Sequence, residues 1–129
     1  MEVKNKVLER IDQCGDEYIA FLKKVISADT RILEHGKRGN EDNGQVIIRE
    51  LLEQYHAQVD VFQPDYESMG FCPEVNPDHD YSGRHNVVGR FCGSGGGRSL
   101  LFNGHIDTVD FGDMGAWKSG PLSPYIEDG

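Results

Sequence analysis

The sequence has no long apolar run and no apolar stretch of signal length near its start. A membrane-spanning helix needs about 20 consecutive apolar residues, and no segment approaches that length. The N-terminus, Met1–Lys6, is charged and does not lead into the apolar core of a signal peptide. We therefore expect a soluble protein that lies in the cytoplasm and does not contact a membrane.

Positive charge is also scarce. The 129 residues include 13 Lys and Arg against 22 Asp and Glu, which gives a formal net charge of −9. A protein with this charge repels a phosphate backbone, and no basic stripe offsets the repulsion. The sequence therefore argues against nucleic acid as a partner.

Cysteine is the third scarce residue. Cys14, Cys72 and Cys92 are odd in number and widely spaced, and none belongs to a Cys-x-x-Cys pair. This pattern predicts free thiols in a reducing compartment. No local pattern supplies the base that a cysteine nucleophile requires. With 37% hydrophobic and 27% charged residues, the chain has the composition of one soluble globular domain, or of part of one.

The apolar residues that are present predict an α/β chain. Helical spacing over Glu2–Ser27 is interrupted at Gly15. The segment therefore forms either two short helices or one kinked helix, and the sequence does not decide between them. A further helix is expected from Glu41 to about Tyr55, and Val59–Phe62 alternates like a short strand. Loops are expected over two polar segments, Arg31–Asn40 and Gln63–Arg84.

Two further apolar runs, Asn86–Phe91 and Ser99–Phe102, flank a glycine-rich segment. The simplest interpretation is a β-hairpin with a flexible tip. The segment Gly93–Gly97 resembles a phosphate-binding loop, but the lysine with Ser or Thr is missing and no helix is expected after it. A hairpin tip is therefore favoured over a phosphate site.

The run ending at Phe102 leads into Asn103-Gly104-His105-Ile106-Asp107. Residues two apart on a strand share a face, so His105 and Asp107 are expected side by side at the edge of a buried strand. A carboxylate that takes one ring N–H fixes the tautomer of a histidine and leaves the other nitrogen for zinc. A catalytic zinc needs about three protein ligands, so the tripeptide taken alone favours a structural pair or a solvated loop.

The loop before the second apolar run contains Asp78-His79-Asp80 and, beyond it, His85. These residue types bind metals, but Asp, Asn and Pro are also common turn residues, and a solvated loop is the favoured interpretation. An alternative is a single-metal site built from His105 with His79 and His85.

Four short motifs follow one another along the chain in an order that is typical of a known enzyme family. Asn86-Val87-Val88-Gly89 is followed by Gly104-His105-Ile106-Asp107-Thr108-Val109, then by Trp117 with prolines after it, and finally by Asp128-Gly129. Together they resemble the dinuclear zinc amidohydrolase and exopeptidase family that includes acetylornithine deacetylase, succinyl-diaminopimelate desuccinylase, aminoacylase and carboxypeptidase G. The resemblance extends along the whole chain.

This resemblance implies a fold and a site. The fold would be the N-terminal portion of a zinc-peptidase-like α/β catalytic domain, with helices packed on a mixed sheet. Residues 1–129 would form one segment of a single catalytic domain, and the remainder of that domain and a dimerisation domain would lie outside them. His105 corresponds to a zinc ligand, and Asp107 corresponds to the catalytic carboxylate that orients it. Trp117 belongs either to a loop that frames the site or to ordinary loop packing.

The resemblance also implies chemistry. The full-length parent would be a homodimer that uses two zinc ions, with cobalt or manganese as alternatives, to hydrolyse amide bonds of small N-acyl amino acids or peptides. The bridging aspartate, the glutamate base and the remaining ligands of the family are not among these residues, so we expect the fragment alone to be inactive and to bind zinc weakly. The alternative is a non-catalytic binding or structural module that shares the topology.

Overall fold

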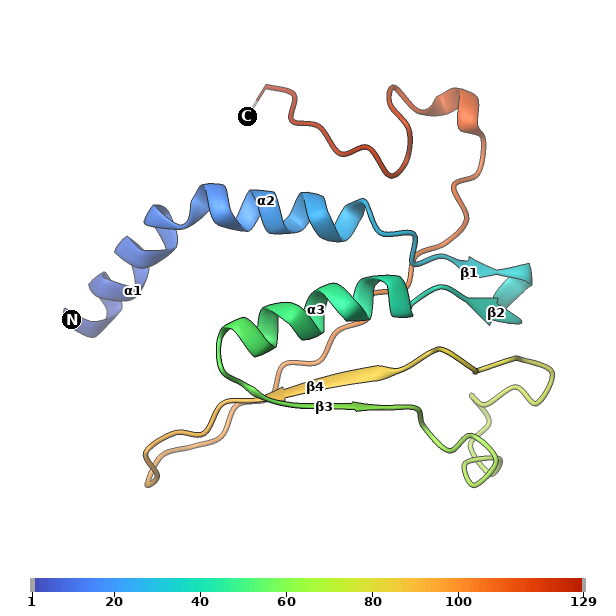
Figure 1. Ribbon diagram of the computed structural model, residues 1–129, viewed down its shortest axis with the longest axis horizontal. Coiled ribbons are helices and arrows are strands. Elements are labelled where there is room, and N and C mark those ends of the chain that lie inside the picture. Colours follow the sequence, from blue (N-terminus) through green and yellow to red (C-terminus); the bar gives the residue numbers. More distant parts are fainter. Residues whose placement is uncertain (1, 129) are drawn as a thin grey trace. The chain divides into compact units, whose positions relative to one another are not determined.

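The computed structural model describes residues 2–128, which form two compact units. Among the described residues, one unit consists of residues 2–28 and 113–128, and the other spans Asp29–Gly112. No helix in residues 2–128 is long and apolar enough to cross a membrane. The elements are, in chain order, α1 (Glu2–Gln13), α2 (Gly15–Ile26), β1 (Ile32–Leu33), η1 (Glu34–Gly36), β2 (Arg38–Gly39), α3 (Asp42–Gln54), β3 (Gln58–Phe62), β4 (Asn86–Arg90) and η2 (Met114–Ala116). The α-helices and β-strands are labelled in Figure 1, and η1 and η2 are short 3-10 helices.

The segment from Glu2 to Ile26 forms two α-helices, which decides between the two possibilities that the sequence left open. The helical geometry is interrupted at Cys14, whose φ and ψ are −98° and 8°. The backbone hydrogen bonds continue across this residue, because its N–H donates to the Arg10 carbonyl at 3.1 Å and its carbonyl accepts from the Tyr18 N–H at 3.0 Å. Cys14 is 3% exposed and is the one buried hydrophobic residue in the part of the chain that is described.

In the second unit, β3 and β4 form an antiparallel pair that carries α3 on one face. The register runs from Gln58 opposite Arg90 to Phe62 opposite Asn86. Gly89 lies on the face that meets α3, because a Cβ atom at this position would come within 2.6 Å of the Leu52 side chain. The missing side chain therefore lets α3 approach the two strands closely (Figure 1).

The predicted hairpin between Asn86–Phe91 and Ser99–Phe102 is wrong. β4 pairs with β3 instead, and residues 99–102 belong to no strand. Leu100, Leu101 and Phe102, which were expected to be buried, are 78%, 85% and 87% exposed. The physical reason is that the glycine-rich tip carries few side chains that could fix a register, whereas β3 and β4 share an apolar face covered by α3.

The combination of helices and strands is confirmed, but residues 2–128 contain no mixed sheet of the kind that was expected. Within residues 2–128 the strands form two antiparallel pairs, and the one parallel contact is an isolated bridge between Arg31 and Thr108. The segment predicted as a loop over Arg31–Asn40 contains the short β1–β2 pair, with Ile32 opposite Gly39. Two-residue strands are too short to leave an alternating pattern in the sequence.

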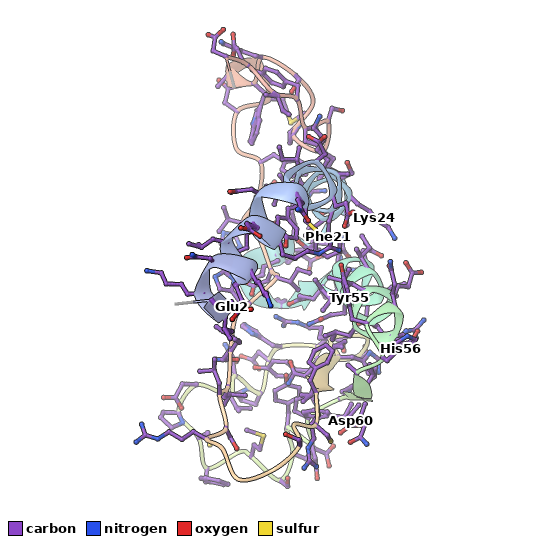
Figure 2. All side chains as sticks on the ribbon, turned by 90° about the vertical axis from the view of Figure 1, so that its left-hand side faces the viewer. Glu2, Phe21, Lys24, Tyr55, His56 and Asp60 are labelled. Carbon is purple, nitrogen blue, oxygen red and sulfur yellow. The ribbon has the colours of Figure 1, made fainter. Side chains whose placement is uncertain are left out.

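The predicted end of α3 is confirmed. His56 has a left-handed φ of 59°, and the N–H of Ala57 returns to the Leu52 carbonyl at 2.9 Å, which satisfies one of the last helical carbonyls. Figure 2 shows Tyr55 and His56 at this end of the helix and Asp60 on the strand that follows. His56 is thus an exposed histidine on a well-defined turn.

Candidate functional site

His105 and Asp107 contact one another, as their spacing predicted. Nδ1 of His105 lies 3.1 Å from Oδ1 of Asp107 and 3.2 Å from its backbone carbonyl oxygen. Both neighbours are acceptors, so Nδ1 carries the proton and Nε2 is unprotonated in the neutral ring. The His105 side chain is 82% exposed and that of Asp107 is 33% exposed. The contact forms in an irregular segment and not on a strand.

The residue between them fixes this segment to the rest of the unit. A Cβ atom on Gly44 of α3 would lie 2.5 Å from Cδ1 of Ile106 and 2.7 Å from Cγ2 of Thr30. Thr108 donates its backbone N–H to the Thr30 carbonyl at 3.1 Å, and its own carbonyl accepts from the Ile32 N–H at 2.8 Å. The His105–Asp107 pair is therefore held between α3 and the chain leading into β1.

A second set of contacts holds the residues that follow. Nε and Nη2 of Arg31 each donate to Asp29 at 2.8 Å, Nη1 donates to Asp110 at 3.2 Å, and the guanidinium lies 3.9 Å from the centre of the Phe111 ring. The hydrogen bond from Arg31 lowers the pKa of the Asp29 carboxyl group, and Asp29 in turn raises the pKa of Arg31. This cluster fixes the path of the chain beyond Thr108.

His105 and Asp107 line a cavity of about 200 Å³ within the second unit. Its lining also includes Glu41, Tyr66, Arg84 and His85. Burial raises the pKa of the Tyr66 hydroxyl, an effect that the charge of Arg84 opposes. The cavity thus brings together two imidazoles, two carboxylates and one guanidinium group. They belong to His85 and His105, to Glu41 and Asp107, and to Arg84.

Glu41 and Arg84 form a buried ion pair beside the two histidines. Nε and Nη2 of Arg84 lie 2.8 Å and 2.6 Å from Oε1 of Glu41. The Arg84 side chain is 15% exposed and the Glu41 side chain is 10% exposed. Oε2 of Glu41 is buried and has no hydrogen-bond partner within the described residues. This oxygen lies against Gly39, where any side chain would overlap it.

His85 forms a second pair with a carboxylate. Its Nδ1 lies 2.8 Å from Oδ2 of Asp42, and its backbone N–H donates to Oδ1 of the same carboxylate at 2.9 Å. The sequence singled out His85 as part of a loop cluster but missed Asp42, which was interpreted as part of the start of a helix. Glu41 and Arg84 were also missed. No rule of local spacing connects partners 43 residues apart.

The alternative single-metal site is not found. Within residues 2–128, no group of three or more His, Cys, Asp or Glu side chains is arranged to hold a metal ion. His79 does not line the cavity. Its Nε2 lies 3.1 Å from the side-chain nitrogen of Asn76 instead. Trp117 belongs to the first unit, where it is 47% exposed, and its role near a site stays a prediction.

Comparison with known proteins gives a partial match. Over 72 residues the chain is 40% identical to the succinyl-diaminopimelate desuccinylases of three strains of Cereibacter sphaeroides. The matched stretch covers 55% of this chain and 18% of each relative, so the chain spans less than a fifth of the curated relatives that it matches. No family model matches the chain. No solved structure matches it either. The identity gives partial support to the resemblance drawn from the motifs.

Proposed function

We propose that these residues are the N-terminal segment of a metal-dependent hydrolase that cleaves the amide bond of N-acyl amino acids or small peptides. The remainder of the catalytic domain and a dimerisation domain would lie outside the segment. The observation that carries the proposal is the His105–Asp107 pair at the cavity, joined by the partial identity to desuccinylases.

The donor atoms present fit one position of a zinc site. Nε2 of His105 is exposed, unprotonated in the neutral ring and free of hydrogen bonds within the described residues. Asp107 holds the opposite nitrogen, which is the arrangement that orients metal-bound histidines in proteins. Bound zinc, for which cobalt or manganese can substitute, lowers the pKa of a water molecule and polarises a carbonyl oxygen. His105 and Asp107 supply one ligand and its orientation, and the other ligands must come from elsewhere.

A direct test follows the five histidines of the chain by NMR during titration with Co²⁺, whose unpaired electrons broaden nearby resonances. We expect the His105 ring signals to broaden at a lower Co²⁺ concentration than those of His56, which is exposed and has no carboxylate partner in the described part of the chain. Asp107→Asn should weaken the binding at His105 about 10- to 100-fold and remove this preference. Equal broadening of His105 and His56 in the unmodified chain would refute the metal assignment.

A second test concerns activity. The 129 residues contain one ligand of the family's metal site and no counterpart of its glutamate base, so we expect no hydrolysis of an N-acyl amino acid by this chain alone. Hydrolysis that chelation abolishes would show that the segment is sufficient by itself. In the complete protein, Asp107→Ala should lower both activity and metal content, whereas a non-catalytic module would change in neither.

A further inference from the structure

The cavity that contains His105 has a second histidine whose ring is held in the same way. His85 lines the cavity, whereas Asp42, which binds its Nδ1, is not part of the lining. The Asp42 carboxylate accepts from both the ring and the backbone N–H of His85, so the side chain is fixed at two points. The ring edge that bears Nε2 has no hydrogen bond within the described residues and is left for a ligand.

The protonation of this ring follows from its partner. An ionised carboxylate only accepts hydrogen bonds, so Nδ1 of His85 carries the proton and Nε2 presents a lone pair when the ring is neutral. The side chains of His85 and Asp42 are 37% and 39% exposed, so neither is sealed from solvent.

The rest of the lining determines which ligand suits this lone pair. Glu41 has one buried carboxylate oxygen without a partner in the described chain, and Asp107 adds a second carboxylate. Arg84, the cation of the lining, already donates through Nε and Nη2 to Glu41. The Asp107 carboxylate and the side-chain carbonyls of Gln45 and Asn86 add further acceptors to the lining, so that it can receive a ligand that carries N–H groups. Within residues 2–128, no three such side chains are arranged to hold a metal ion between His85 and His105.

We propose that His85 is a substrate-binding residue of this cavity, and that its Nε2 accepts a hydrogen bond from an N–H group of an amide or amine substrate. The proposal rests on the function proposed above, because the N-acyl amino acids named there carry such an N–H next to the bond that is cleaved. Asp42 is then a positioning residue, which sets the tautomer of His85 and does not touch the substrate.

The tautomer supplies the sharpest test. Nitrogen NMR of the His85 ring should show a protonated Nδ1 and an unprotonated Nε2. His56, which has no carboxylate partner in residues 2–128, serves as the internal reference. Asp42→Asn keeps an oxygen for the backbone N–H of His85 but places a donor against Nδ1. It should therefore move the proton to Nε2 and turn the acceptor into a donor. A protonated Nε2 in the unmodified chain at neutral pH would overturn the proposal.

Binding is tested with N-acetyl-L-alanine as the probe. We expect the His85 Nε2 signal to shift on addition of the probe and this shift to be lost in Asp42→Asn. In the complete protein, Asp42→Asn and His85→Ala should raise KM roughly three- to tenfold, the value of one neutral hydrogen bond, and leave kcat nearly unchanged. His85→Ala keeps the backbone bond to Asp42 and so serves as a second variant if the first one unfolds.

The outcomes separate this proposal from the metal assignment. If N-acetyl-L-alanine binds the unmodified chain, Asp42→Asn and His85→Ala with equal affinity, His85 has no binding role, even if His105 retains its preference for Co²⁺. If His105 shows no preference for Co²⁺ while His85 responds to the probe, the metal assignment fails and the binding role of His85 stands.

Discussion

Gly44 is the position at which the fold and the candidate site depend most directly on one another. A methyl group there would come within 2.5 Å of Ile106 and 2.7 Å of Thr30. Thr30 is 3% exposed and its Cγ2 lies one bond from its Cβ, so it has little freedom to move away. Overpacking of this kind costs about 1–3 kcal/mol. The gain in helix propensity on replacing glycine by alanine is about 1 kcal/mol, so Gly44→Ala should destabilise the chain by about 1 kcal/mol.

Gly15→Ala is the matched control, because it makes the same chemical change at the first residue of α2. Nothing lies within 4 Å of a Cβ atom at this position. Without a clash, the substitution should stabilise the chain by up to about 0.5–1 kcal/mol. The two variants are therefore expected to change stability in opposite directions.

Urea denaturation followed by circular dichroism measures both changes, and amide NMR shifts localise them. The Gly44→Ala variant should shift the amides of His105, Ile106 and Asp107, because Ile106 must move to admit the methyl group. The Gly15→Ala variant should leave those amides unchanged. If Gly44→Ala stabilises the chain without moving the Ile106 amide, the close packing of α3 on this segment is refuted.

Two further predictions concern charged groups. Arg84→Met should destabilise the chain by about 3–5 kcal/mol in denaturant titrations, since it leaves the Glu41 carboxylate buried without a cation, and the double variant with Glu41→Gln should recover much of the loss. The argument fails if the double variant is no more stable than Arg84→Met alone. Because Arg31 lowers the pKa of Asp29 below its ordinary 3.8, the stabilisation from this pair should be complete above that pH and decline as the pH falls through the folded-state pKa. Asp29→Asn should remove this part of the acid dependence in unfolding measured as a function of pH.

The helices and one strand were predictable from the sequence because their patterns are local. Apolar residues at helical spacing located α1, α2 and α3, and the alternation over Val59–Phe62 located β3. The contact between His105 and Asp107 was predictable for the same reason, since only one residue separates them in the sequence. Their roles in metal binding and catalysis stay predictions, because geometry alone does not test them.

The rest of the site depends on partners far apart in the chain. Asp42 and His85 are 43 residues apart, and so are Glu41 and Arg84, so no window of sequence contains both members of either pair. The hairpin was mispredicted for a related reason. Adjacent apolar runs favour pairing with one another, but β4 finds its partner across a long loop because α3 covers the face that β3 and β4 share.

The contact between Thr30 and Thr108 also affects the order in which parts of the chain fold. The two threonines are 78 residues apart, and closing a loop of that length costs about 4 kcal/mol of chain entropy beyond a constant. Such a contact forms after local ones such as the helices and the β1–β2 pair. On the ribosome it also cannot form until nearly the whole segment has been synthesised. The His105–Asp107 pair is therefore expected to be placed among the last parts of this segment to order, after α3 has already formed the surface that receives it.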